Sequence, residues 1–173
     1  MVDCTKKAPP WVLMALVVGM ALCGVDGSWA NEPDAWKQLF TDGVKAREAA
    51  HYAEAEQLLQ RALRGAEQVS PDDPRVATAA NNLGLLYHDQ GRLQEAQSLY
   101  TRALAIWEQQ LGPEHEDVAA ALNNLAEIAH AEGDWGRAEP LYERVLAIER
   151  KVLGAAHPDV AISLNNLAEL YRK

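Results

Sequence analysis

The sequence has 173 residues and a formal net charge of −9, and its cysteines and methionines all lie in the first 23 positions. The remainder therefore offers no thiol nucleophile, disulfide or cysteine metal site. A single phenylalanine leaves little material for a sheet. The acidic balance disfavours nucleic acids and anionic lipid surfaces as partners.

The first thirty residues have the layout of a signal peptide. Lys6 and Lys7 precede an apolar or small stretch over 11–25, and Ser28-Trp29-Ala30 places small residues before a cleavage point. The apolar stretch is shorter than the roughly 20 residues that a membrane-spanning helix needs. We therefore predict a signal peptide over 1–30, cleaved after Ala30, a short linker over 31–34, and a secreted or periplasmic protein.

Two alternatives to cleavage stay open for this segment. An uncleaved N-terminus would anchor the protein to the membrane. Lipidation at Cys23 is less favoured, because Leu22 stands where a lipobox has a small residue. After cleavage the charge remains −9, and we expect no further membrane span.

An internal repeat is the strongest feature of the chain. Asn-Asn-Leu occurs at 81–83, 123–125 and 165–167, in steps of 42 residues, and many other positions keep the same step. These include Gly91 and Gly133, Ala96 and Ala138, Tyr100 and Tyr142, Gly112 and Gly154, and His115 and His157. Self-similarity at this period predicts a stack of equivalent structural units.

Within each unit the apolar residues follow two helical stripes. The stripes of the second unit are Ala80, Leu83, Gly84 and Tyr87, then Ala96, Leu99, Tyr100, Ala103 and Trp107. Gly91 and Gly133 stand between the stripes, where a helix end favours a left-handed residue. Each unit is thus predicted to be two antiparallel helices in an all-α fold.

These residues resemble the tetratricopeptide repeat (TPR), in the 42-residue form of kinesin light chains and many bacterial proteins. The resemblance rests on Leu122–Glu127, Ala138–Arg144 and the Leu-Gly-x-x-His-Pro-Asp-Val segment at 153–160. It implies an α-α superhelix, a right-handed TPR solenoid with a concave groove that binds a protein or peptide. We divide the chain into a degenerate N-terminal cap at 35–76, units at 77–118 and 119–160, and a half repeat, a single helix, at 161–173.

The asparagine pairs are the main candidates for contacts to a partner. They lie offset from the apolar stripes, toward the side that TPR superhelices expose, where amides could hold an extended peptide by its backbone. Alternatively, one asparagine of each pair bonds a neighbouring helix and only organises the stack. The predicted groove residues are Phe40, Arg47, Asn81, Asn82, Leu85, His88, Asn123, Asn124, Glu127, His130, Asn165 and Asn166, with Asn82, Asn124 and Asn166 favoured as members of an amide ladder.

We predict neither catalysis nor a metal or cofactor. His115 and His157 precede Asp117 and Asp159, but stacked helices about 8–10 Å apart cannot bring equivalent histidines to one ion. We interpret these pairs as helix starts, in which the aspartate satisfies free N–H groups. The predicted function is an exported scaffold for protein–protein interaction. The alternatives are self-assembly as a homo-oligomer through the exposed C-terminal helix, or regulation or presentation of a separately encoded enzyme.

Overall fold

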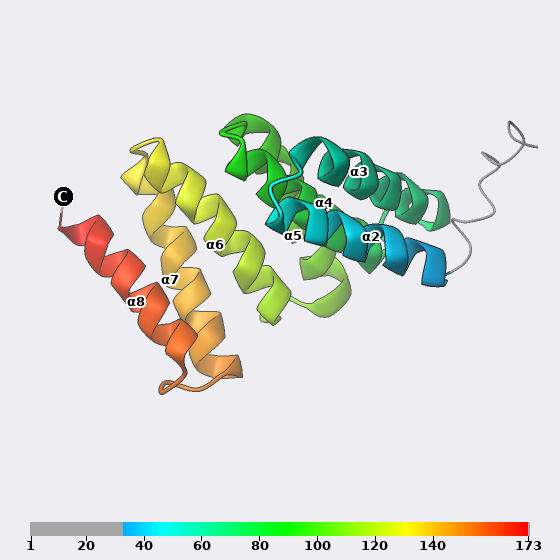
Figure 1. Ribbon diagram of the computed structural model, residues 1–173. Helices are drawn as coiled ribbons and strands as arrows, with labels where there is room; N and C mark the ends of the chain where they lie inside the picture. Colours follow the sequence, from blue (N-terminus) through cyan, green and yellow to red (C-terminus); the bar gives the residue numbers. More distant parts are fainter. Residues whose placement is uncertain (1–32, 173) are drawn as a thin grey trace, which may run out of the picture.

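The computed structural model describes residues 33–172, so the predicted signal peptide lies outside the described residues. The elements are α2 (Pro33–Glu48), α3 (Tyr52–Val69), α4 (Pro74–Asp89), α5 (Leu93–Leu111), α6 (Glu116–Ala131), α7 (Trp135–Val152) and α8 (Pro158–Tyr171). Figure 1 shows them following one another along the molecule in chain order, from α2 and α3 at one end to α8 at the other.

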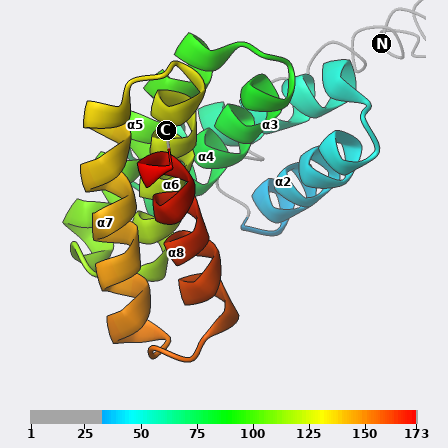
Figure 2. The same cartoon turned by 90° about the vertical axis from the view of Figure 1, so that its left-hand side faces the viewer.

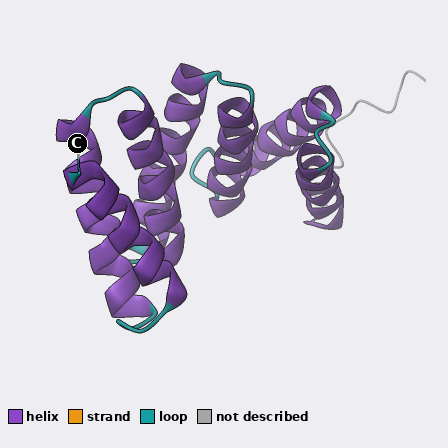
Figure 3. Ribbon diagram, turned by 60° about the vertical axis from the view of Figure 1, so that its left-hand side comes forward, coloured by secondary structure: helices purple, strands orange, loops and turns teal. Residues whose placement is uncertain are grey.

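The helices form consecutive pairs. α2, α4 and α6 are the first helices and pack closely against the second helices α3, α5 and α7, while α8 is a first helix that packs against α7. Figure 2, viewed from the end that carries α8, shows α7 and α8 side by side. Every element in the described residues is a helix or a loop (Figure 3). The predicted all-α stack of helix pairs is confirmed.

The turns between paired helices need a left-handed residue, as the sequence predicts. Gly91 and Gly133 both have φ of 74°. In the first pair the corresponding position is Ala50, which has φ of 58°. An alanine in this region carries a steric cost of about 1 kcal/mol that glycine avoids. The first unit thus differs from the others in its turn, and it also has Phe40 and Thr41 where they have the asparagine pair.

Small residues set how closely paired helices approach. Gly84 of α4 faces Tyr100 of α5, and a Cβ added there would meet the tyrosine ring at 2.7 Å. Tyr100 is only 1% exposed. One large cluster of buried side chains runs from Ala46 of α2 to Ile148 of α7, and a smaller one joins α6, α7 and α8.

The last helix leaves one side uncovered. Leu164 and Tyr171 are 43% and 62% exposed, whereas Leu122, which corresponds to Leu164 in α6, is 1% exposed. The difference arises because α4 and α6 bury this side against a second helix of their own pair, whereas no second helix follows α8 within the described residues.

Candidate functional site

The predicted groove residues lie on all four first helices. We call the surface formed by α2, α4, α6 and α8 the first-helix face. α2 contributes Phe40 and Arg47, α4 contributes Asn81, Asn82, Leu85 and His88, α6 contributes Asn123, Asn124, Glu127 and His130, and α8 contributes Asn165 and Asn166.

One asparagine pair joins two units directly. The Asn124 Nδ2 of α6 donates a hydrogen bond to the Asn81 Oδ1 of α4 at 3.0 Å. Asn81 is buried, with 9% of its surface exposed. A buried amide oxygen without a partner would cost about 1–3 kcal/mol. This contact matches the alternative interpretation of the asparagine pairs, in which one asparagine bonds a neighbouring helix and organises the stack.

The other asparagines make no hydrogen bond between units among the described residues. Asn82 Nδ2 donates to the carbonyl of Thr78 one turn earlier at 2.9 Å, and Asn123 Nδ2 donates to Glu127 Oε1 at 2.8 Å. Asn165 is exposed and Asn166 is half-buried. Among residues 33–172, Asn81–Asn124 is the one asparagine–asparagine bond between first helices, so the intramolecular contacts do not themselves form a ladder.

The remaining central positions combine apolar and titratable side chains. Leu85 and His88 are half-buried, and Glu127 is exposed. His130 meets the ring of Trp135 edge-on, with centroids 5.0 Å apart. Its Nε2 is buried and makes no hydrogen bond with another described residue. These positions can offer apolar contact and hydrogen bonds to a partner.

The α2 end of the face is tied into the fold. The Phe40 ring stacks on Trp36 at 5.0 Å, and the Trp36 indole donates to the Ala62 carbonyl of α3. Arg47 forms an ion pair with Asp89 of α4 at 2.9 Å. Both predicted groove residues therefore have structural contacts, and the Arg47 charge is already neutralised by its neighbour.

The carboxylate of Glu127 acts on the tyrosines of the second helices. Burial raises the pKa of Tyr142 to about 12, and the negative charges of Glu127 and Glu169 add to this shift. Burial also raises the pKa of Tyr100, again with a contribution from Glu127. Glu127 therefore lies close enough to both core tyrosines to disfavour their ionisation.

The recurring histidines start helices. The His115 Nδ1 accepts a hydrogen bond from the Asp117 backbone N–H, and His157 does the same for Asp159. Asp73 caps α4 at the corresponding position by accepting from the Arg75 N–H at 2.8 Å. The interpretation as helix starts is confirmed, but the capping group is the imidazole and not the following aspartate.

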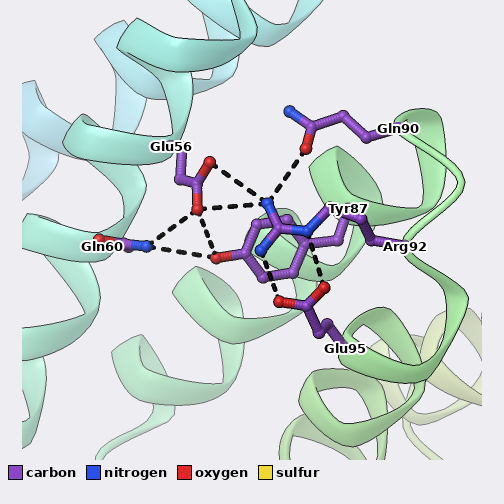
Figure 4. Close-up of polar contacts among 6 residues, drawn as sticks. All are labelled: Glu56, Gln60, Tyr87, Gln90, Arg92 and Glu95. Atoms are coloured by element: carbon purple, nitrogen blue, oxygen red, sulfur yellow. Dashed lines mark hydrogen bonds and ion pairs between the residues drawn. The ribbon is translucent and has the colours of Figure 1, made fainter.

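A polar network that the sequence analysis missed joins the first two pairs (Figure 4). Tyr87 donates to the Glu56 Oε1 of α3 at 2.9 Å, and the Arg92 guanidinium lies 3.7 Å above the Tyr87 ring centroid. Arg92 also bonds Glu56 at 3.3 Å and Glu95 at 2.7 Å. Arg92 thus ties the turn after α4 to the preceding unit.

The same tyrosine contact recurs at the far end. Tyr171 of α8 donates to Glu139 of α7 at 2.5 Å. Tyr171 occupies the repeat position of Tyr87, and Glu139 that of Glu56. This shared register is the sequence signal that could have identified the pair. It shows that Tyr171, although 62% exposed, is held by its hydroxyl.

Two kinds of feature, a metal site and a membrane-spanning helix, can be checked in the described residues. Residues 33–172 contain no group of three or more His, Cys, Asp or Glu side chains that could hold a metal ion. In that same part of the chain no helix is both long and apolar enough to span a bilayer.

The geometry defines a class of protein: an α-solenoid in which helix pairs repeat every 42 residues and one face is built from first helices. A family model described as tetratricopeptide repeat matches residues 46–109, 75–148 and 117–173. The chain belongs to the tetratricopeptide repeat family. TPR proteins bind protein partners and are typically scaffolds without enzymatic activity. No curated protein sequence matches the chain.

Solved structures agree with this family. BtubC (BKLC) from P. vanneervenii has a TM-score of 0.74 and 26% identity, over 82% of this chain and 57% of that one. A Podosopora anserina protein described as kinesin light chain-like, with nearly identical TPR-like repeats, has a TM-score of 0.72 and 26% identity, over 82% and 68%. The Sgt2 TPR domain from Aspergillus fumigatus has a TM-score of 0.59 and 21% identity, over 84% and 82%, and shows the fold alone.

Proposed function

We propose that this protein is an exported scaffold that holds a protein partner on its first-helix face. The partner lies as an extended segment across α4 and α6, with the asparagine amides bonding its backbone. The observation that carries the proposal is that the amides of Asn82 and Asn123 and the side chain of Leu85 are only half-buried on α4 and α6, together with the protein-binding character of the family.

The asparagines divide between two tasks in this proposal. Asn124 already donates to Asn81, so its amide N–H contributes to the stack, and its carbonyl oxygen is the group left for a partner. Asn82 donates only to its own helix and can exchange that bond for one to a peptide carbonyl. Asn82 is therefore the cleaner probe of binding, because removing it leaves the contact between units intact.

The experiment first locates the partner and then tests the amide. A photo-crosslinking residue at Leu85 should capture the partner in cells, whereas the same residue at the exposed Ser98 of the second helix α5 should not. With the captured partner purified, Asn82→Ala should weaken binding by about two- to tenfold, as expected for one lost hydrogen bond. Equal capture at both positions, or unchanged affinity of Asn82→Ala, would argue against a first-helix groove.

Export is part of the proposal and has its own test. It is supported by the basic, apolar and small-residue pattern of 1–30. Fractionation of the producing cell, with mass determination of the mature N-terminus, should find the protein outside the cytoplasm and beginning at Asn31. A cytoplasmic chain that retains Met1 would contradict export while leaving the scaffold function standing.

A second candidate function, self-association through α8, rests on a specific observation. Leu164 and Tyr171 are exposed at positions that the preceding first helix buries. Two copies could cover each other there. Sedimentation over a range of protein concentrations distinguishes this candidate: a monomer at every concentration removes it, whereas a dimer that Leu164→Glu dissociates supports it.

A further inference from the structure

A pocket of about 270 Å³ opens where α7 leads into α8. Its walls come from the first turns of α6 and α8 and the last turns of α7. Ile148, Val152 and Ile162 supply apolar surface, and the last two are 47% and 60% exposed. An engineered apolar cavity of about 150 Å³ accepts benzene, so this pocket has room for a large side chain.

The pocket lies where the third unit departs from the sequence of the second. By the 42-residue step Glu149 corresponds to Trp107, which is 4% exposed and belongs to the large buried cluster. The shorter glutamate leaves open the place that an indole fills one unit earlier. Ser163 likewise replaces Ala121, and its hydroxyl donates to the Glu149 Oε2 at 2.7 Å. Both substitutions place polar atoms where the preceding unit is apolar.

The charge in the pocket has one sign. Glu149, Glu116 and Asp159 line it, and no lysine or arginine within residues 33–172 does so. Partial burial raises the pKa of Glu149, the nearby Asp159 adds to the shift, and the Ser163 hydrogen bond and His157 act against it. The nearest basic residues in sequence do not line this pocket: Arg150 is exposed, and Lys151 pairs with Glu114. A cation brought in from elsewhere would relieve the repulsion among these carboxylates.

We propose that this pocket receives a lysine or arginine side chain from the partner segment. The aliphatic stem packs against Val152 and Ile162, and the cationic group meets the Glu149 carboxylate. Long basic side chains combine an apolar stem with a charged end, which is the pairing that these walls offer. The inference rests on the proposed function, because Asn123 of the first-helix face lines the same pocket. The inference adds to the proposed function the chemical character of the partner, which carries a basic residue in its extended segment.

Blocked tripeptides test the charge requirement directly on the full chain. Leu-Arg-Leu and Leu-Lys-Leu peptides, titrated against isotopically labelled protein, should shift the backbone amide signals of Val152, Ile162 and Ser163. Leu-citrulline-Leu keeps the shape of arginine without its charge and should bind about tenfold more weakly. Equal binding of the citrulline peptide, shifts confined to other residues, or no binding at millimolar peptide would overturn the proposal. Self-association of the chain that blocks the peptide would assign the pocket to a second copy and also overturn it.

Variants of the pocket complete the test. Glu149→Gln removes the charge at nearly constant shape and should weaken the arginine peptide about tenfold. Glu149→Trp restores the residue of the preceding unit and should abolish binding by filling the space. Glu143→Gln removes a charge from an exposed position of the same helix and should leave binding unchanged. If Glu149→Gln binds like the native chain, the pocket is not the site, even where Glu149→Trp fails to fold.

The two proposals fail separately. Loss of partner binding in Asn82→Ala but not in Glu149→Gln would leave the first-helix groove and remove the basic-residue pocket. Peptide binding at Val152 and Ile162 with no effect of Asn82→Ala on the partner would leave the pocket and remove the amide contacts.

Discussion

Gly84→Ala tests how closely α4 and α5 must approach. An alanine Cβ at this position would lie 2.7 Å from Tyr100 Cε1 and 2.9 Å from Cδ1. Carbon atoms in contact prefer about 3.5–4.0 Å, and Tyr100 is too deeply buried to turn away into solvent. The ring or the helix axis must therefore shift.

Two effects of opposite sign set the magnitude. Replacing glycine by alanine inside a helix stabilises it by about 1 kcal/mol, whereas overpacking a core costs about 1–3 kcal/mol. The next unit has Ala126 at this position and Tyr142 at that of Tyr100, so a helix pair can accommodate the methyl group when it is spaced for it. We expect a net loss of about 1 kcal/mol in the free energy of unfolding.

Urea unfolding followed by circular dichroism measures this difference, with Gly136→Ala as the matched control. A Cβ at Gly136, also in a helix, would meet its nearest neighbour, Asp134 Oδ1, at 3.8 Å, which is ordinary contact. The control should therefore gain about 0.5–1 kcal/mol. If Gly84→Ala is stabilised as much as the control, the close approach does not constrain this pair and the reasoning is refuted.

Three further predictions concern the turns and contacts between units. Ala50→Gly should raise the free energy of unfolding by about 1 kcal/mol in the same urea assay, because it removes an alanine from the left-handed region. The control Ala53→Gly, inside α3, should lower it by about as much. If both variants change the free energy of unfolding in the same direction, the backbone strain at Ala50 is contradicted. His115→Ala should lower the free energy of unfolding by about 1 kcal/mol, because α6 loses its cap, whereas His115→Asp should keep it. Equal stability of the two variants would count against capping by His115. Hydrogen bonding to Glu139 raises the pKa of Tyr171 to about 12, so the contribution of its neutral phenol to stability is lost as the pH rises from about 10 to 12. An absorbance titration of the tyrosines should lose one ionisation step of high pKa in Tyr171→Phe. An unchanged titration curve would refute the assignment.

The repeat made the helical architecture predictable from the sequence. Stripes such as Leu83–Tyr87, with a glycine at position 91, mark where a helix runs and where it stops, and the structure confirms both. These properties depend on residues close in sequence, whose spacing along one helix is fixed. The sequence also predicted an exposed C-terminal helix, and Leu164 and Tyr171 of α8 are exposed in the structure.

Contacts between units could not be predicted in the same way. Whether Asn124 turns toward Asn81 or toward a partner depends on the separation of α4 and α6, which the period does not specify. The Arg92 network was missed for the same reason, since Glu56 lies 36 residues earlier. The capping role of His115 was attributed to Asp117 because both side chains can accept from a backbone N–H, and only geometry distinguishes them.

The positions that break the repeat are the ones that can carry specificity. The leucine that recurs at 83, 125 and 167 is buried in the stack, and packing accounts for it. Glu149 is different, because the corresponding residue of the preceding unit, Trp107, is a buried member of the core. Partial burial of its carboxylate has a desolvation cost that the Ser163 hydrogen bond offsets only in part, because the pKa of Glu149 is still raised. A cationic partner group would offset it, which is why the pocket between α6, α7 and α8 is the place where this solenoid should differ in binding from another of the same fold.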